Sequence, residues 1–134
     1  MTAAALTVGI DLVQVSRIAE SLDRFGDRFL KRIFTEGEIA YARAEPEQTA
    51  ERLAARFAAK EATIKAMGLA EQPFNWRDIE VRRTSSGACE IDLHGSVGAF
   101  ASSSGAGPLI VSLSHEGDYA TAVVISCGPR IQDT

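Results

Sequence analysis

Residues 53–67 read LAARFAAKEATIKAM, a run of strong helix formers without glycine or proline. Leu53, Phe57 and Ile64 recur on roughly one helical face, which predicts that this face is buried. The run is the longest uninterrupted helical pattern in the chain. We therefore expect the other segments to pack around it.

Two charged residues of this helix are spaced for contact. Glu61 and Lys65 lie four positions apart, which places their Cβ atoms about 5–6 Å from each other on a helix. A carboxylate and an amine on a mostly buried helix suit a site that holds a cation and a phosphate. An ordinary helix ion pair, worth about 0.2–0.5 kcal/mol, explains the same spacing. From this helix alone the ion pair is the simpler interpretation.

Residues 7–13 read TVGIDLV and predict a first strand that is apolar almost throughout and hence largely buried. Asp11 interrupts the apolar run. Aspartate is depleted in strands, and a buried carboxylate is costly unless it is paired, hydrogen-bonded or bound to a metal. Asp11 could instead cap the helix that begins near Gln14. A helix cap and a functional carboxylate both remain open at this point.

A helical pattern extends from residue 14 to about 33, with a break or bend expected at Gly26. Arg17, Arg24 and Arg28 are spaced by seven and four residues, so they share a face if the helix continues. A basic stripe on a protein of net charge −4 suits docking to an acidic partner. Acidic residues are interspersed, however, and taken alone the pattern favours a solvated helix face.

The remaining segments predict an α+β fold in which the long central helix packs on a mainly antiparallel sheet. Thr35 and Glu38 form a capping-box pattern that should open a short helix ending near residue 44. Gly68 should end the long helix, which begins near residue 47. Further elements are expected as strands at 78–82, 88–93, 109–114 and 119–125, a hairpin turn at 84–87, a weak helix at 96–103 and a frayed tail at 128–134.

His115 follows an expected strand, at a position from which a side chain can reach a ligand. A lone histidine is more often structural. Because Ser112, Ser114 and a tight turn lie beside it in the sequence, we keep His115 as a candidate ligand-binding residue.

The composition bounds the class of protein. A chain of 134 residues is expected to form one domain. Its net charge of −4 and pI near 5.2 argue against a general nucleic-acid binder. No apolar run approaches the ~20 residues that span a bilayer, and no signal peptide is recognised. The expectation is a cytoplasmic protein with reduced thiols at Cys89 and Cys127.

Three separated stretches together resemble the holo-acyl-carrier-protein synthases, which are small 4′-phosphopantetheinyl transferases. They are GIDLV at 9–13, RFAAKEA at 56–62 followed by Lys65 and Ala66, and SLSHEGDYA at 112–120. Their order and spacing are similar to those of the family. The resemblance covers most of residues 7–126, which we take as the core of a single domain spanning 1–134.

The resemblance implies a reaction and a metal. The family transfers the phosphopantetheine arm of coenzyme A to a serine of an apo acyl carrier protein, releasing adenosine 3′,5′-bisphosphate, in fatty acid biosynthesis. Asp11 and Glu61 match the family's carboxylate ligands of Mg²⁺, an ion that favours one or two carboxylates together with waters and phosphates. Glu61 and Lys65 match its catalytic positions, with Lys65 at the pyrophosphate. The base remains open between Glu61 and a metal-bound water.

The resemblance also implies binding surfaces. Arg56 and His115, with Ser114 nearby, match positions at the 3′-phosphate and adenosine end of coenzyme A. The basic stripe falls where the family meets its acidic carrier protein, which reverses the solvated-face interpretation; its members are Arg17, Arg24 and Arg28. The small members of the family assemble as homotrimers with active sites between subunits, so we expect a homotrimer.

Two stretches depart from the family. Residues 67–71 read MGLAE where a glycine-rich loop is frequent, and residues 87–89 read GAC where Gly-Lys/Arg-Pro is frequent. Neither departure involves Asp11, Glu61 or Lys65. We keep two alternatives beside the transferase. They are a non-catalytic docking module for carrier proteins and a metal-dependent hydrolase of nucleotide pyrophosphates.

Overall fold

A computed structural model describes residues 2–106 and 108–132. The elements in chain order are β1 (Thr2–Gln14), α1 (Val15–Phe25), α2 (Asp27–Ile33), α3 (Glu36–Arg43), a 3-10 turn (Pro46–Gln48), α4 (Thr49–Met67), a second 3-10 turn (Trp76–Asp78), β2 (Ile79–Arg83), β3 (Cys89–Leu93), α5 (Gly95–Ser104), β4 (Leu109–Glu116) and β5 (Tyr119–Gln132). The predicted α+β class is confirmed.

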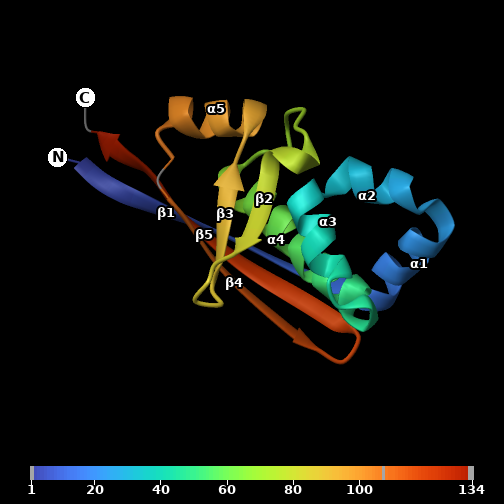
Figure 1. Cartoon of the computed structure of the whole chain (residues 1–134). Coiled ribbons are helices and arrows are strands. Elements are labelled where there is room, and N and C mark those ends of the chain that lie inside the picture. The colour runs from blue at the N-terminus through green and yellow to red at the C-terminus, as the bar shows by residue number, and fades with distance from the viewer. Residues whose placement is uncertain (1, 107, 133–134) are drawn as a thin grey trace.

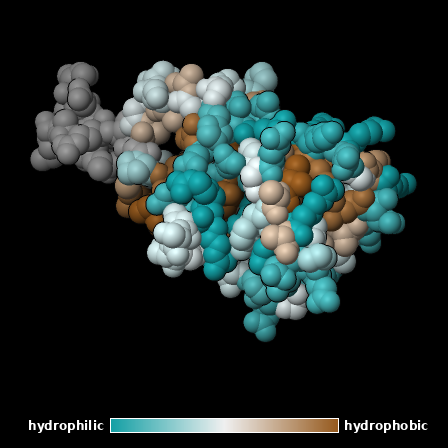
Figure 2. Space-filling view, in the orientation of Figure 1, coloured by the Kyte–Doolittle hydropathy of each residue, from teal (hydrophilic) through white to brown (hydrophobic). Residues whose placement is uncertain are grey.

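The strands form two antiparallel units, a three-stranded sheet in the order β1-β5-β4 and the hairpin β2-β3. Helix α4 lies between them, with the sheet on one side and α3 and the hairpin on the other (Figure 1). Hydrophilic residues cover most of the face of the molecule on which the helices and the hairpin lie (Figure 2). Hydrophobic residues appear on this face in separate patches. Within the described residues, no helix is both long and apolar enough to cross a membrane.

Helix α4 is buried on almost every side, which goes beyond the single buried face that was predicted. Leu53 and Ile64 are buried as expected, and so are Arg56, Lys60 and most of the alanines. The alanines allow the sheet and α3 to approach the helix closely from both sides. Gly68 ends α4 in the left-handed conformation, as predicted.

A buried ion pair that sequence reasoning missed joins α4 to α3. Lys60 Nζ lies 2.8 Å from Glu38 Oε1, and neither side chain is exposed to solvent. The amine also donates to the carbonyls of Trp76 and Ile79. The other carboxylate oxygen of Glu38 accepts from the Val81 amide at 2.8 Å. The pair is thus fully hydrogen-bonded, which buried charges require.

Glu38 also completes the capping box with Thr35, and this part was predicted. The Glu38 carboxylate accepts from the Thr35 amide at 2.9 Å, while the Thr35 hydroxyl accepts from the Glu38 amide at 3.2 Å. One glutamate therefore both starts α3 and neutralises a lysine of α4.

Strand β1 departs from the prediction that it is largely buried. Gly9 and Val13 face α4 and are buried, but the alternate side chains are 59–69% exposed; these are Leu6, Val8, Ile10 and Leu12. The single chain covers only one face of the three-stranded sheet. The apolar run in the sequence could not reveal that one face of the strand stays exposed in the single chain.

The C-terminal tail also differs from expectation. Residues 128–132, predicted to be frayed, continue β5, because Thr2, Ala3 and Ala4 extend β1 beyond its predicted start and pair with Gln132, Ile131 and Arg130. Residues 133–134 lie outside the described part of the chain. The other predicted strands and the turn at 84–87 are confirmed, and the weak helix forms as α5.

Candidate active site

The close approach of β1 and α4 creates the first part of the site. Gly9 has no side chain, and a Cβ built on it would lie 1.9 Å from the carbonyl oxygen of Ala62. The Thr7 hydroxyl donates to the carbonyl of Ala66 at 2.6 Å, which fixes the strand against the helix. Asp11 follows Gly9 by two residues and therefore points to the same side, toward α4.

This arrangement brings together three residues that the sequence singled out. Lys65 Nζ lies 3.3 Å from Asp11 Oδ1 and 2.9 Å from the carbonyl oxygen of Ile10. The Asp11 side chain is 19% exposed, whereas that of Lys65 is 52% exposed. Glu61 stands one turn before Lys65 on α4 and is half-buried. Glu61 and Lys65 of α4 thus form a three-residue cluster with Asp11 of β1.

The electrostatics of the cluster favour a bound cation. Burial raises the pKa of the Glu61 carboxyl, the negative charge of Asp11 raises it further, and Lys65 opposes both effects. A divalent cation between the two carboxylates would relieve their repulsion. Two carboxylates also match the preference of Mg²⁺, which takes its other ligands from water and phosphates. No larger group of metal-ligating side chains occurs within the described residues.

The alternative that Asp11 caps α1 is wrong. The first turn of this helix is capped from the β4–β5 connection, where the Asp118 carboxylate accepts from the Ser16 amide at 3.0 Å and from the Ser16 hydroxyl at 2.6 Å. Gln14, at the N-cap position, makes no side-chain cap. Asp11 is therefore available to a ligand at the β1–α4 junction.

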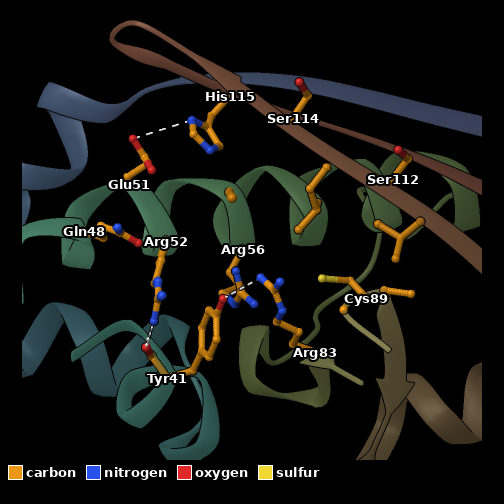
Figure 3. Close-up of a pocket in the computed structure, with 15 residues that line it drawn as sticks. Tyr41, Gln48, Glu51, Arg52, Arg56, Arg83, Cys89, Ser112, Ser114 and His115 are labelled. Carbon is orange, nitrogen blue, oxygen red and sulfur yellow. Dashed lines mark hydrogen bonds and ion pairs between the residues drawn. The ribbon is translucent and has the colours of Figure 1, made fainter. Parts of the chain in front are cut away.

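A second feature is a pocket of about 470 Å³ between α4, Tyr41 of α3, the β2–β3 hairpin and β4. Three arginines surround Tyr41 within it (Figure 3). The guanidinium carbons of Arg52 and Arg56 each lie 4.2 Å from the centre of the Tyr41 ring. Arg83 donates to the Tyr41 hydroxyl at 2.9 Å. The pocket thus concentrates positive charge and is suited to an anionic ligand.

Arg56 is the most unusual of these arginines because it is only 4% exposed. Within the described residues its Nε has no hydrogen-bond partner. Burial lowers the pKa of the guanidinium, which nevertheless remains charged. A buried charged donor without a partner is costly. Because Arg56 also lines the pocket, its guanidinium charge is suited to an anionic ligand there.

The structure places His115 and Ser114 differently with respect to this pocket. His115 points toward α4, where its Nδ1 lies 3.6 Å from Glu51 Oε2. Ser114 lines the pocket, but its hydroxyl points away from the arginines (Figure 3). Arg56 and His115 therefore line one pocket, and Ser114 contributes at its border.

Sequence reasoning missed several pocket residues. Arg52 precedes Arg56 by four positions, and this helical spacing was a usable signal. Tyr41 and Arg83 come from distant segments, and no local pattern relates them to α4.

The predicted basic stripe is divided between two helices. Gly26 adopts φ 54° and ends α1, so Arg17 and Arg24 lie on α1 whereas Arg28 lies on α2. The condition that all three share one helical face is therefore not met. All three are exposed, and Arg24 lies over the half-exposed ring of Phe25 at 5.7 Å.

Comparison with known proteins agrees with this geometry. Residues 7–124 match the 4′-phosphopantetheinyl transferase superfamily. A holo-acyl-carrier-protein synthase from Koribacter versatilis is 46% identical over 121 residues, which are 90% of this chain and 96% of that protein.

Solved structures are similar over nearly the whole chain. The ACPS–CoA complex from Chronobacterium ammoniagenes gives a TM-score of 0.81 at 37% identity and covers 92% of this chain and 98% of that one. Holo-acyl-carrier-protein synthase from Helicobacter pylori, in complex with coenzyme A, gives 0.77 at 28% identity, with 89% and 98% covered. The chain therefore belongs to the 4′-phosphopantetheinyl transferase superfamily and, within it, to the holo-acyl-carrier-protein synthases.

Proposed function

We propose that this protein transfers the 4′-phosphopantetheine arm of coenzyme A to a serine of an apo acyl carrier protein in fatty acid biosynthesis. The serine oxygen bonds to the β-phosphorus, the pyrophosphate bond breaks, and adenosine 3′,5′-bisphosphate leaves. The observation that carries the proposal is the cluster of Asp11, Glu61 and Lys65 at the β1–α4 junction, in a chain whose relatives catalyse this reaction or bind coenzyme A.

Each residue of the cluster has a role that follows from its chemistry. Asp11 and Glu61 hold Mg²⁺, which neutralises phosphate charge when bound. The exposed amine of Lys65 stabilises the negative charge that develops on the pyrophosphate oxygens. Glu61 is one candidate base for the serine proton, and a water held by the cation is the other.

The arginine pocket holds the phosphate-rich end of coenzyme A. Arg56 offers its guanidinium charge to the 3′-phosphate, and Arg52 and Arg83 add positive charge around it. His115 binds from β4, with Ser114 at the border of the pocket. In this arrangement the pyrophosphate of coenzyme A lies at the cluster of Lys65 and the two carboxylates.

The carrier protein docks on the exposed arginines of α1 and α2. Arg17, Arg24 and Arg28 offer positive charge to an acidic partner, and Phe25 provides a neighbouring apolar contact. Charge of this kind increases the association rate and orients the partner, and it is screened by salt.

The protein assembles as a homotrimer through the uncovered face of its sheet. The exposed apolar side chains of β1 are joined on this face by Ile110 of β4, and Ile10 pairs with Val123 of β5. A continuous exposed apolar surface of this kind is typical of a protein interface. The Ser114 hydroxyl points away from the arginines, which is consistent with an active site that continues into the neighbouring subunit.

The test is to incubate the protein with coenzyme A, Mg²⁺ and an apo carrier protein and to measure the intact mass of the carrier. The expected result is a gain of one phosphopantetheine that EDTA abolishes. Carrier binding without a mass gain, across several carriers, would instead support the docking module. Release of adenosine 3′,5′-bisphosphate without a carrier would support the hydrolase.

A further inference from the structure

A free thiol lies in the wall of the arginine pocket. Cys89 begins β3 and pairs directly with Arg83 of β2 in the hairpin. Its sulfur points toward the arginines and is half-buried, so the pocket gives access to it (Figure 3). Neither the phosphate-binding role of the pocket nor the chemistry at Asp11 uses this thiol.

The surroundings of Cys89 favour the approach of a negatively charged reagent. The thiolate is the nucleophile in exchange reactions, and neighbouring positive charge stabilises it. Arg56 lies close enough for a charge on the Cys89 sulfur to raise the pKa of the guanidinium, although burial lowers that pKa overall. Arg56 also lines the pocket, and its buried Nε has no hydrogen-bond partner in the part of the chain that the structure describes. The guanidinium groups of the pocket attract a negatively charged reagent to the place where this sulfur lies.

We propose that Cys89 is a reversible modification site for small anionic disulfides, the chemical class that includes the disulfide of coenzyme A. The Cys89 thiolate attacks one sulfur of the disulfide, and the sulfur–sulfur bond of the small molecule breaks. One half stays on Cys89 as a mixed disulfide, and the other leaves as a thiolate that takes a proton from water. A small thiol reverses the reaction.

The consequence is loss of coenzyme A binding, and this part rests on the proposed function of the pocket. The group attached to Cys89 occupies space beside Arg56 and Arg83 that the phosphates of coenzyme A would need. Oxidation of the small-thiol pool would therefore inhibit the enzyme, and reduction would restore it.

The second cysteine provides a matched control. Cys127 lies in β5, is also half-buried, and is not among the residues that line the pocket. Cys127→Ser leaves Cys89 as the only thiol, and Cys89→Ser leaves only Cys127. The two variants thus compare thiols of similar exposure in different electrostatic surroundings.

The experiment measures the rate of modification with two probes, the anionic dithiobis(nitrobenzoate) and the cationic cystamine. We expect the anionic probe to react at least about tenfold faster with Cys127→Ser than with Cys89→Ser, and cystamine to lose this preference. Adenosine 3′,5′-bisphosphate should slow only the modification of Cys89. Adding Arg83→Gln to Cys127→Ser should slow the anionic probe more than the cationic one.

The outcomes separate this inference from the proposed function. Equal rates for the two thiols, or full coenzyme A binding after stoichiometric modification of Cys89, would overturn the inference. The unmodified Cys127→Ser protein is assayed for transfer in the same series. If it makes no holo carrier while adenosine 3′,5′-bisphosphate still protects Cys89, the proposed function fails and the modification site stands.

Discussion

Replacing Gly9 with alanine tests whether the contact between β1 and α4 builds the active site. The new Cβ would lie 1.9 Å from the Ala62 carbonyl oxygen and 2.9 Å from the Ala66 amide nitrogen. Both neighbours are backbone atoms of a buried helix, so neither can rotate away. An ordinary contact distance near 3.4 Å requires the strand and the helix to separate by roughly 1.5 Å.

Overpacking of this kind costs about 1–3 kcal/mol and occasionally more. Because the clash involves backbone on both sides, we expect Gly9→Ala to lower the free energy of unfolding by about 3 kcal/mol. Asp11 would move with the strand, away from its contact with Lys65 at 3.3 Å. The transfer rate should therefore fall even under conditions in which the variant is folded.

The assay is urea unfolding followed by far-ultraviolet circular dichroism, at one protein concentration because the proposed subunit association would contribute to stability. Gly98→Ala in helix α5 is the matched control. The Cβ of this alanine would lie 3.2 Å from the carbonyl oxygen of Leu93. That substitution needs only a small shift, and alanine favours the helix by about 1 kcal/mol. A Gly9→Ala variant with unchanged stability and full activity would refute the reasoning.

Other perturbations test the remaining parts of the molecule. Lys60→Met should cost about 3–5 kcal/mol in urea unfolding because the Glu38 charge is left buried and unpaired; a loss below about 1 kcal/mol would contradict this. Mg²⁺ affinity, measured by calorimetry, should fall as the pH decreases through the raised pKa of Glu61, because protons then compete for that carboxylate. A Mg²⁺ affinity that stays constant from neutral pH down to the ordinary pKa range of a glutamate carboxyl would exclude Glu61 as a ligand. Arg24→Glu should raise the KM for the carrier most strongly at low salt, and an unchanged KM would leave this arginine on a solvated face. Ile10→Asp should convert the proposed trimer to monomers in light scattering, whereas a trimer that stays intact would place the interface elsewhere.

The elements with local signals were predictable from the sequence. The long helical run, the capping box at Thr35 and the stop at Gly68 all appear as expected, because their determinants lie within a few residues of each other. The relation of Glu61 to Lys65 is of the same kind. The proximity of Asp11 to Lys65 joins distant segments, and only the family resemblance suggested that the two residues share a site.

The parts that failed depend on contacts that a single sequence does not encode locally. The outward-facing residues of β1 are as apolar as those of a buried strand, so the pattern could not reveal that this face remains uncovered within the chain. Lys60 appears as one more charged residue in a helix, and its burial depends on Glu38 in a different element. Tyr41 and Arg83 reach the pocket from α3 and β2, far from Arg56 in the sequence.

The central claim is that Asp11 and Glu61 form the reaction centre, and single-turnover transfer tests it most directly. Wild-type protein or Asp11→Ala, in excess over an apo carrier protein, is mixed with coenzyme A and Mg²⁺. The intact mass of the carrier is then followed with time. We predict that the wild type converts the carrier fully and that Asp11→Ala, although folded by circular dichroism, is slower by at least about 100-fold. Transfer by folded Asp11→Ala at the wild-type rate would contradict the account.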